Sequence, residues 1–90
     1  MSKDDIEKIK LHILKKLFDK RCWMHKHFNI NNISQGLPPH ARDSRIIKKA
    51  TDELIKSQWL LSKPTHYGLE LSLNTEKKKE IEEYIEKNLF

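Results

Sequence analysis

The feature that most constrains the fold is a helical pattern of apolar residues that passes directly into two strand-like segments. These segments are residues 41–57, 59–63 and 69–74, with a turn at residues 64–68 that is called the hairpin tip below. Leu69, Leu71 and Leu73 alternate with polar residues, as in a strand that buries one face. Gly68 can adopt the positive φ that a tight turn requires. We therefore expect a helix followed by a two-stranded antiparallel hairpin.

The rest of the chain has three further helical patterns and one mixed segment. Apolar side chains at three- and four-residue spacing predict helices over residues 3–19 and 75–88. Residues 22–28 contain Trp and Phe and predict a first strand that pairs with the later hairpin. Residues 30–36 predict a short helix, which Gly36 and two following prolines end. The expected fold class is α+β and mostly helical, with a small antiparallel sheet and a C-terminal helix.

Size and hydropathy limit the kind of protein this can be. Residues 1–90 suffice for a single domain with one modest core, which argues against a large catalytic cleft. The longest apolar run, Trp59–Leu61, is far shorter than a membrane span of about 20 residues, and the N-terminus lacks the apolar stretch of a signal peptide. We therefore expect no membrane association and a cytoplasmic location. The single cysteine, Cys22, agrees with a reducing compartment.

The positive charge is concentrated in the middle of the sequence. The formal net charge is +5, and residues 20–67 carry nine Lys or Arg against three Asp or Glu. Residues 68–90 carry four Lys against six Glu. Charge gathered in one part of a fold indicates a polyanionic partner more strongly than an even basic balance does. Nucleic acid is the partner that we expect.

The ordered elements carry a resemblance to a known family over about residues 4–74. The residues that carry it are Gln35–His40, Ile47–Ala50 with Glu53–Ile55, Trp59–Leu61 and Lys63–Gly68. In these the chain resembles the winged helix-turn-helix family, and in particular its small archaeal-type members. It departs from the family pattern at Gln58, where such domains often carry Gly, and in the Pro38-Pro39 turn between the two central helices.

The resemblance implies a nucleic-acid site made of a recognition helix and a wing. The helix over residues 41–57 would enter the major groove, and the hairpin tip would be the wing beside it. The groove-facing residues would be His40, Arg42, Ser44, Arg45, Lys48 and Lys49. The wing residues would be Lys63, Thr65, His66 and Tyr67. Additional contacts are expected from Lys20, Arg21, His25, Lys26 and His27.

The chemistry of these side chains suggests different roles, and each set also has a simpler interpretation. The planar guanidinium of Arg45 suits the two acceptors of a guanine, whereas Lys48 and Lys49 suit phosphates. Alternatively, this is a solvated helix face with Asp52 and Glu53 as ion-pair partners. The wing has two interpretations: it offers donors to phosphates and a tyrosine for stacking, or it is a plain hairpin. In the plain hairpin the proline protects an edge and the tyrosine covers the next leucine.

Neither metal binding nor catalysis has a convincing pattern. Cys22, His25 and His27 form one short cluster, whereas a structural zinc site normally draws paired ligands from two motifs. The serines lack a nucleophile setting, and the sequence has no glycine-rich phosphate loop. We expect no metal, no cofactor and no enzymatic activity.

Two classes of function remain after these exclusions. The first is a sequence-reading DNA-binding transcriptional regulator, because a helix fits the major groove of B-form DNA but not the deep groove of RNA. Structured or looped RNA is the alternative ligand. The second class is a protein-interaction module or homodimer, formed through the terminal helices if Tyr84, Ile85, Leu89 and Phe90 are not used in the chain's own core.

Overall fold

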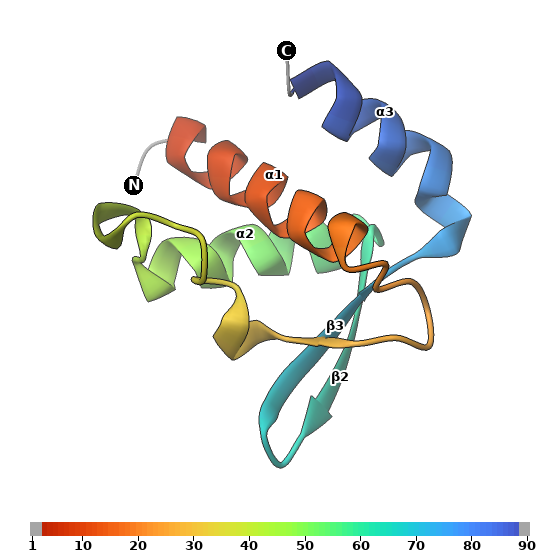
Figure 1. Ribbon diagram of the computed structural model, residues 1–90, viewed down its shortest axis with the longest axis horizontal. Helices are drawn as coiled ribbons and strands as arrows, with labels where there is room; N and C mark the ends of the chain where they lie inside the picture. Colours follow the sequence, from red (N-terminus) through yellow and green to blue (C-terminus); the bar gives the residue numbers. More distant parts are fainter. Residues whose placement is uncertain (1–2, 89–90) are drawn as a thin grey trace.

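Helix α1 (Lys3–Asp19) lies across α2 (Ser44–Lys56), and a hairpin of β2 (Leu60–Thr65) and β3 (Gly68–Leu73) extends away from both helices (Figure 1). The computed structural model describes residues 3–88. The remaining elements are β1 (Phe28–Asn29), the 3₁₀ helices η1 (Ile30–Asn32), η2 (Pro39–Ala41) and η3 (Thr75–Lys77), and α3 (Lys78–Asn88). The strand order is β1-β3-β2, and both pairings are antiparallel. The described residues therefore form the α+β fold that the sequence predicts.

The core lies where α1 packs on α2, β3 and α3. The predicted stripe of α1 is confirmed, since Ile13, Leu14 and Leu17 are fully buried. They meet Leu71 and Leu73, which are also fully buried on the inner face of β3. Full burial of each such side chain stabilises the fold by about 1.5–3 kcal/mol relative to its exposure to water. This core holds the base of the hairpin against the helices.

Helix α2 starts three residues later than the predicted boundary at residue 41, because Asp43 caps it. The Asp43 carboxylate Oδ1 accepts a hydrogen bond from the Arg45 amide at 2.9 Å, which satisfies one free amide of the first turn. Residues Pro39–Ala41 form η2 instead. The helical pattern of apolar residues over this segment is confirmed, since Ile47, Ala50 and Leu54 are buried on one face of α2.

The expected strand over residues 22–28 is wrong for most of its length. Only Phe28–Asn29 pairs as a strand, and Trp23 makes one isolated bridge to Leu73. Arg21 and Met24 have φ angles of 55° and 49°, which are incompatible with an extended strand. Most of the segment is therefore a loop that wraps the base of the hairpin.

The expected helix over residues 30–36 is also wrong, since it is reduced to η1 and a series of turns. The amides of Ile33, Gln35 and Leu37 bond to carbonyls three residues earlier, which is the 3₁₀ pattern. Asn and Ser are weak helix formers in this segment, and Gly36 with φ of +90° ends it.

The predicted hairpin is confirmed, with a tip shorter than expected. Thr65 pairs with Gly68, so only His66 and Tyr67 lie between the strands, and Gly68 takes φ of +113°. Pro64 lies in β2, which is an edge strand and so tolerates a residue without an amide hydrogen. Beyond Leu60 every residue of β2 is exposed. The tip therefore projects from the core as a narrow arm.

The C-terminal helix is used in the chain's own core. Ile85 is buried, and the ring of Tyr84 packs edge-on against Trp59 with centroids 5.5 Å apart. The expected helix over residues 75–88 begins as η3, which the Asn74 side chain caps. Of the four residues considered for a dimer seam, two therefore pack internally, and Leu89 and Phe90 lie outside the described residues.

Candidate nucleic-acid interface

A surface hollow of about 310 Å³ lies between the turn after β1 and the first turns of α2. Its walls carry polar and basic side chains around two isoleucines. The residues that line it are Ile30, Asn31, Ser34, Arg42, Ser44, Ile47 and Lys48. It is called the α2 hollow below. The structure thus brings Arg42, Ser44 and Lys48, three of the predicted groove-facing residues, to one depression.

The hairpin tip is fixed by side chains that bond to its backbone. The Thr65 hydroxyl donates to the Gly68 carbonyl at 2.8 Å and accepts from the Tyr67 amide at 3.2 Å. The side-chain amides of Asn29 and Asn31 donate to the Tyr67 carbonyl at 2.9 and 3.3 Å. The backbone of the tip is therefore restrained by contacts from within the turn and from β1 and η1.

Asn31 connects the two features, because it lines the α2 hollow and also bonds to the hairpin tip. A β-carbon on Gly68 would lie 3.1 Å from the Asn31 amide nitrogen, which confirms how closely they approach. Figure 1 shows η1 between the start of α2 and the hairpin, with α3 on the other side of α1. The hollow and the tip therefore belong to one face of the molecule.

Two predicted contact residues already have acidic neighbours. The Arg45 guanidinium meets Asp43 through two hydrogen bonds, at 3.3 and 3.1 Å, and the Lys48 ammonium meets Asp52 at 2.8 Å. The side chains of Arg45 and Lys48 are 79% and 75% exposed. Exposed pairs of this kind are worth about 0–1 kcal/mol, so a phosphate or base can displace the carboxylate at small cost.

The pairing lowers the pKa of Asp43. Its cause is first the side-chain hydrogen bond from Arg45 and then the bond from the Arg45 backbone amide. The same contact raises the pKa of Arg45. The simpler interpretation of a solvated face is partly supported, since Lys48 and Asp52 do form an ion pair one helical turn apart. Glu53, however, pairs with a lysine of α1 rather than along α2.

Three other predicted groove-facing residues, Lys49, Arg42 and His40, lie in different surroundings. Lys49 is exposed on α2 and takes part in none of the ion pairs among residues 3–88. The Arg42 Nε donates to the Leu37 carbonyl at 2.9 Å, and this bond stabilises the turn that precedes α2. His40 lies in η2 and lines a separate, smaller hollow with Lys8. His40 is therefore not brought into the α2 hollow.

The predicted wing residues are exposed, but they differ in which of their polar groups are free to bind a partner. Tyr67 is 82% exposed, so it does not cover Leu69, and that part of the plain-hairpin interpretation is wrong. Thr65 uses its hydroxyl proton within the turn. Lys63 pairs in register with Glu70, which places an acid beside the lysine that precedes the hairpin tip. His66 is exposed.

Most of the additional basic residues lie toward the end of the hairpin that is opposite its tip. Lys20, Arg21, His25, Lys26 and His27 are exposed in the loop before β1. In that loop Trp23 bridges to Leu73 at one end of β3, whereas Gly68 at the other end of β3 belongs to the hairpin tip. Five residues of extended strand separate these positions by about 17 Å. The part of the loop around Trp23 therefore lies away from the hairpin tip, whereas His27 directly precedes Phe28, which pairs with Leu71 closer to the tip.

Cys22, His25 and His27, the short cluster weighed above against the pattern of a zinc site, do not come together as metal ligands in the described part of the chain. No group of three or more His, Cys, Asp or Glu side chains within residues 3–88 is arranged to hold a metal ion. Cys22 is buried, and its burial raises the pKa of the thiol, although the charges of Lys26 and Lys20 oppose the shift.

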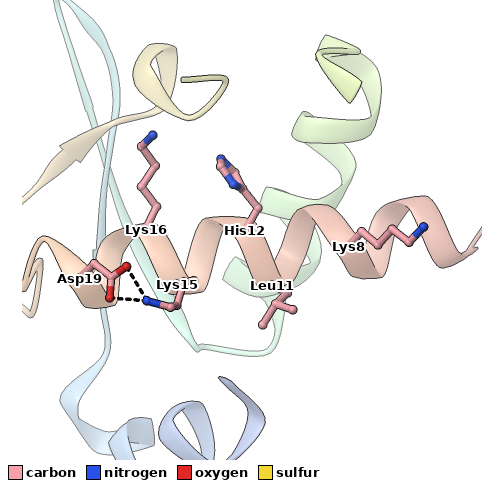
Figure 2. A pocket seen from close by; sticks show the side chains of 6 residues that line it. All are labelled: Lys8, Leu11, His12, Lys15, Lys16 and Asp19. Carbon is pink, nitrogen blue, oxygen red and sulfur yellow. Dashed lines mark hydrogen bonds and ion pairs between the residues drawn. The ribbon is translucent and has the colours of Figure 1, made fainter. Parts of the chain in front are cut away.

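A second polar surface on α1 holds the turn that follows η1. His12 Nε2 lies 2.7 Å from the Ile33 carbonyl, and the Lys16 ammonium donates to the Gln35 carbonyl. Figure 2 shows both side chains on one side of α1, beside a shallow hollow of about 420 Å³. Their contacts fix the segment between β1 and η2, which forms one wall of the α2 hollow.

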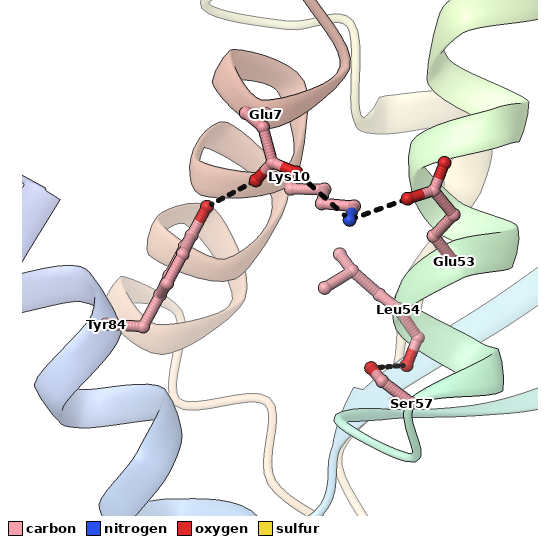
Figure 3. Close-up of polar contacts among 6 residues, drawn as sticks. All are labelled: Glu7, Lys10, Glu53, Leu54, Ser57 and Tyr84. Carbon is pink, nitrogen blue, oxygen red and sulfur yellow. Dashed lines mark hydrogen bonds and ion pairs between the residues drawn. The ribbon is translucent and has the colours of Figure 1, made fainter. Parts of the chain in front are cut away.

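A polar network joins the three α-helices behind this face (Figure 3). Lys10 of α1 bonds to Glu53 of α2 at 2.7 Å and to Glu7 at 3.4 Å, and Glu7 accepts a bond from the Tyr84 hydroxyl at 3.2 Å. Partial burial opposes the charged form of Lys10, but the two glutamates outweigh it and raise its pKa. Burial, with the charge of Glu7, raises the pKa of Tyr84 to about 12.

Sequence reasoning missed three residues that organise the site. Asp43 precedes the periodic residues of α2 in the way that an N-cap does, so a capping rule could have found it. Asn29 and Asn31 had no comparable signal, because their partner at Tyr67 lies 38 and 36 residues further along the chain.

Comparison with protein-family profiles, with curated proteins and with solved structures finds no match for this chain. None of the helices within residues 3–88 is long and apolar enough to cross a membrane. The assignment of a function therefore depends on the geometry and chemistry of the chain itself.

Proposed function

We propose that the chain is a DNA-binding module of the winged helix-turn-helix type, acting as a transcriptional regulator and not as an enzyme. In this proposal the N-terminal half of α2 enters the major groove. Arg45 reads a base, Lys48 and Lys49 contact phosphates, and the hairpin tip contacts the DNA beside the groove. The order of elements over residues 28–73 agrees with this assignment, with η1 in place of the second helix of the motif.

The single observation that carries the proposal is the continuity of the interface. Asn31 lines the α2 hollow with Arg42 and Lys48, and it also bonds to the hairpin tip at Tyr67. A surface that binds a groove and its flanking backbone needs a helix and a second element on one face at a fixed spacing. The asparagine contacts supply that fixed spacing here.

Binding to a short DNA duplex at several salt concentrations tests the proposal. In the test variant, Lys48→Gln and Lys63→Gln remove one cation from α2 and one from β2. In the control variant, Lys79→Gln and Lys87→Gln remove two exposed cations from α3, on the other side of α1. Net charge changes equally in both.

The test variant should reduce the slope of log K against log salt by about 2, because each phosphate contact contributes about 0.9 to it. The control should keep the wild-type slope. Equal losses in both variants, or no salt dependence in the wild type, would contradict the proposed interface. Hairpin RNA and single-stranded DNA in parallel titrations identify the preferred ligand.

A further inference from the structure

The hairpin tip carries little positive charge for an element that contacts phosphates. Residues 64–68 include no Lys or Arg, Lys63 just before them lies opposite Glu70 in the strand register, and the Thr65 hydroxyl proton is used within the turn. What the tip presents instead is an aromatic ring. Tyr67 is 82% exposed, against 37% and 36% for Met24 and Leu61, the other exposed large hydrophobic residues among those described.

The ring of Tyr67 is presented from a backbone that is fixed on both sides. Its amide donates to Thr65 Oγ1 at 3.2 Å, and its carbonyl accepts bonds from Asn29 at 2.9 Å and Asn31 at 3.3 Å. A flexible tip would lose conformational freedom when it binds, whereas this one is already ordered. An ordered and almost fully exposed aromatic ring is suited to a flat, apolar partner.

We infer that Tyr67 stacks on an unpaired nucleobase, so that the preferred ligand is duplex DNA with an unpaired nucleotide beside the bound segment. This inference rests on the proposed function and names its ligand class. Stacking of a base on an aromatic side chain requires an exposed π-face and no particular base sequence. Base pairs inside a continuous duplex do not offer that face, because their neighbours cover it.

The test compares three short DNA duplexes of one sequence. One is blunt, one carries a single-stranded overhang with bases, and one carries an abasic overhang of the same length. The two overhangs have the same number of phosphates and differ only in the bases. A 2-aminopurine in the base-bearing overhang reports stacking through its fluorescence.

Wild-type protein should bind the base-bearing overhang about 5- to 150-fold more tightly than the abasic one, which corresponds to about 1–3 kcal/mol for one stacked base. The 2-aminopurine fluorescence should be quenched on binding. Tyr67→Ala and Tyr67→Leu should abolish the preference, whereas Tyr67→Trp should keep it. Because the side chain is exposed and its bonds involve backbone atoms, these variants should unfold at the same temperature as wild type.

The outcomes separate the two proposals. Equal binding of the base-bearing and abasic duplexes, with the salt dependence intact, would overturn the stacking inference and leave the proposed function in place. Retention of the preference in Tyr67→Ala would also overturn it. Failure to bind any of the three duplexes would overturn both.

Discussion

Replacement of three neighbouring asparagines should reveal how the hairpin tip is joined to η1. Asn29 caps η1 by accepting the Asn31 amide at 2.8 Å, and its side-chain amide donates to the Tyr67 carbonyl at 2.9 Å and to the Glu70 carboxylate at 3.3 Å. Asn31 donates one longer bond to that carbonyl, at 3.3 Å. The side chain of Asn32 makes no hydrogen bond within residues 3–88 and is exposed, so Asn32→Ala is the matched control.

These contacts predict how much each of the three substitutions lowers the free energy of unfolding. A lost cap costs about 1 kcal/mol, the bond to Tyr67 about 1 kcal/mol and the longer bond to Glu70 about 0.5 kcal/mol, so Asn29→Ala should lower the free energy of unfolding by about 2.5 kcal/mol. Asn31→Ala removes one long and exposed bond and should cost about 0.5 kcal/mol. Asn32→Ala should stay within about 0.5 kcal/mol of wild type.

Urea unfolding followed by circular dichroism measures these free energies, and an unchanged m-value would show that the change lies in stability rather than in residual structure. Amide exchange at Tyr67 and Gly68 should accelerate in Asn29→Ala and Asn31→Ala but not in Asn32→Ala. If Asn29→Ala matched the Asn32→Ala control, the fixed connection between the tip and the α2 hollow would be refuted.

Three further changes follow from the backbone and from the titrating groups. Gln58 has φ of 65°, so Gln58→Gly should raise the free energy of unfolding by about 0.5–1 kcal/mol, while Gln58→Ala should give no such gain in the same urea experiment. Tyr84 has a pKa raised to about 12, so the stability it contributes is complete below pH 10 and is lost between pH 10 and 12. Tyr84→Phe should flatten that alkaline loss in pH-dependent melting. Asp43 has a lowered pKa, so the stability from its contact with Arg45 is present above about pH 4 and is lost as the pH falls below it. Asp43→Asn keeps a capping side chain and should reduce that acid-dependent loss in acid titrations followed by circular dichroism.

Each of the three has an outcome that would contradict it. A Gln58→Gly protein less stable than wild type would show that the positive φ costs little. An unchanged alkaline transition in Tyr84→Phe, or an unchanged acid transition in Asp43→Asn, would show that the contact contributes nothing to the pH dependence of stability.

The parts of the fold that the sequence predicts are those with a strong local period. Ile13, Leu14 and Leu17 repeat at helical spacing, and Leu71 and Leu73 alternate, so burial and periodicity point to the same elements. These patterns sufficed for α1, α2 and the hairpin because each buries one face against the others.

Residues 20–27 could not be predicted in this way, because long-range contacts decide their conformation. The Cys22 amide bonds to the Leu17 carbonyl at the end of α1, and Trp23 bridges to Leu73 of β3. With Arg21 and Met24 at positive φ, the chain turns where the residue types alone favour a strand.

The candidate site also has a part that the sequence predicts and a part that depends on long-range contacts. The cations of α2 followed from helical periodicity, since Arg45, Lys48 and Lys49 are all exposed on it. Their relation to the hairpin tip depends on Asn31, whose partner is distant in sequence and leaves no local signal. Sequence alone therefore indicated the cations that we propose for binding, but not the contact that places them on one face with the hairpin tip.

The central claim is that the start of α2, η1 and the hairpin tip form one DNA-binding face. Titration of ¹⁵N-labelled protein with a short DNA duplex, followed by NMR, tests it most directly, because each amide reports whether it lies at the interface. The account predicts that the largest shift changes fall in residues 30–34, 42–49 and 63–68. Changes confined to α3 or to the loop at residues 20–27, or none at saturating DNA, would contradict it.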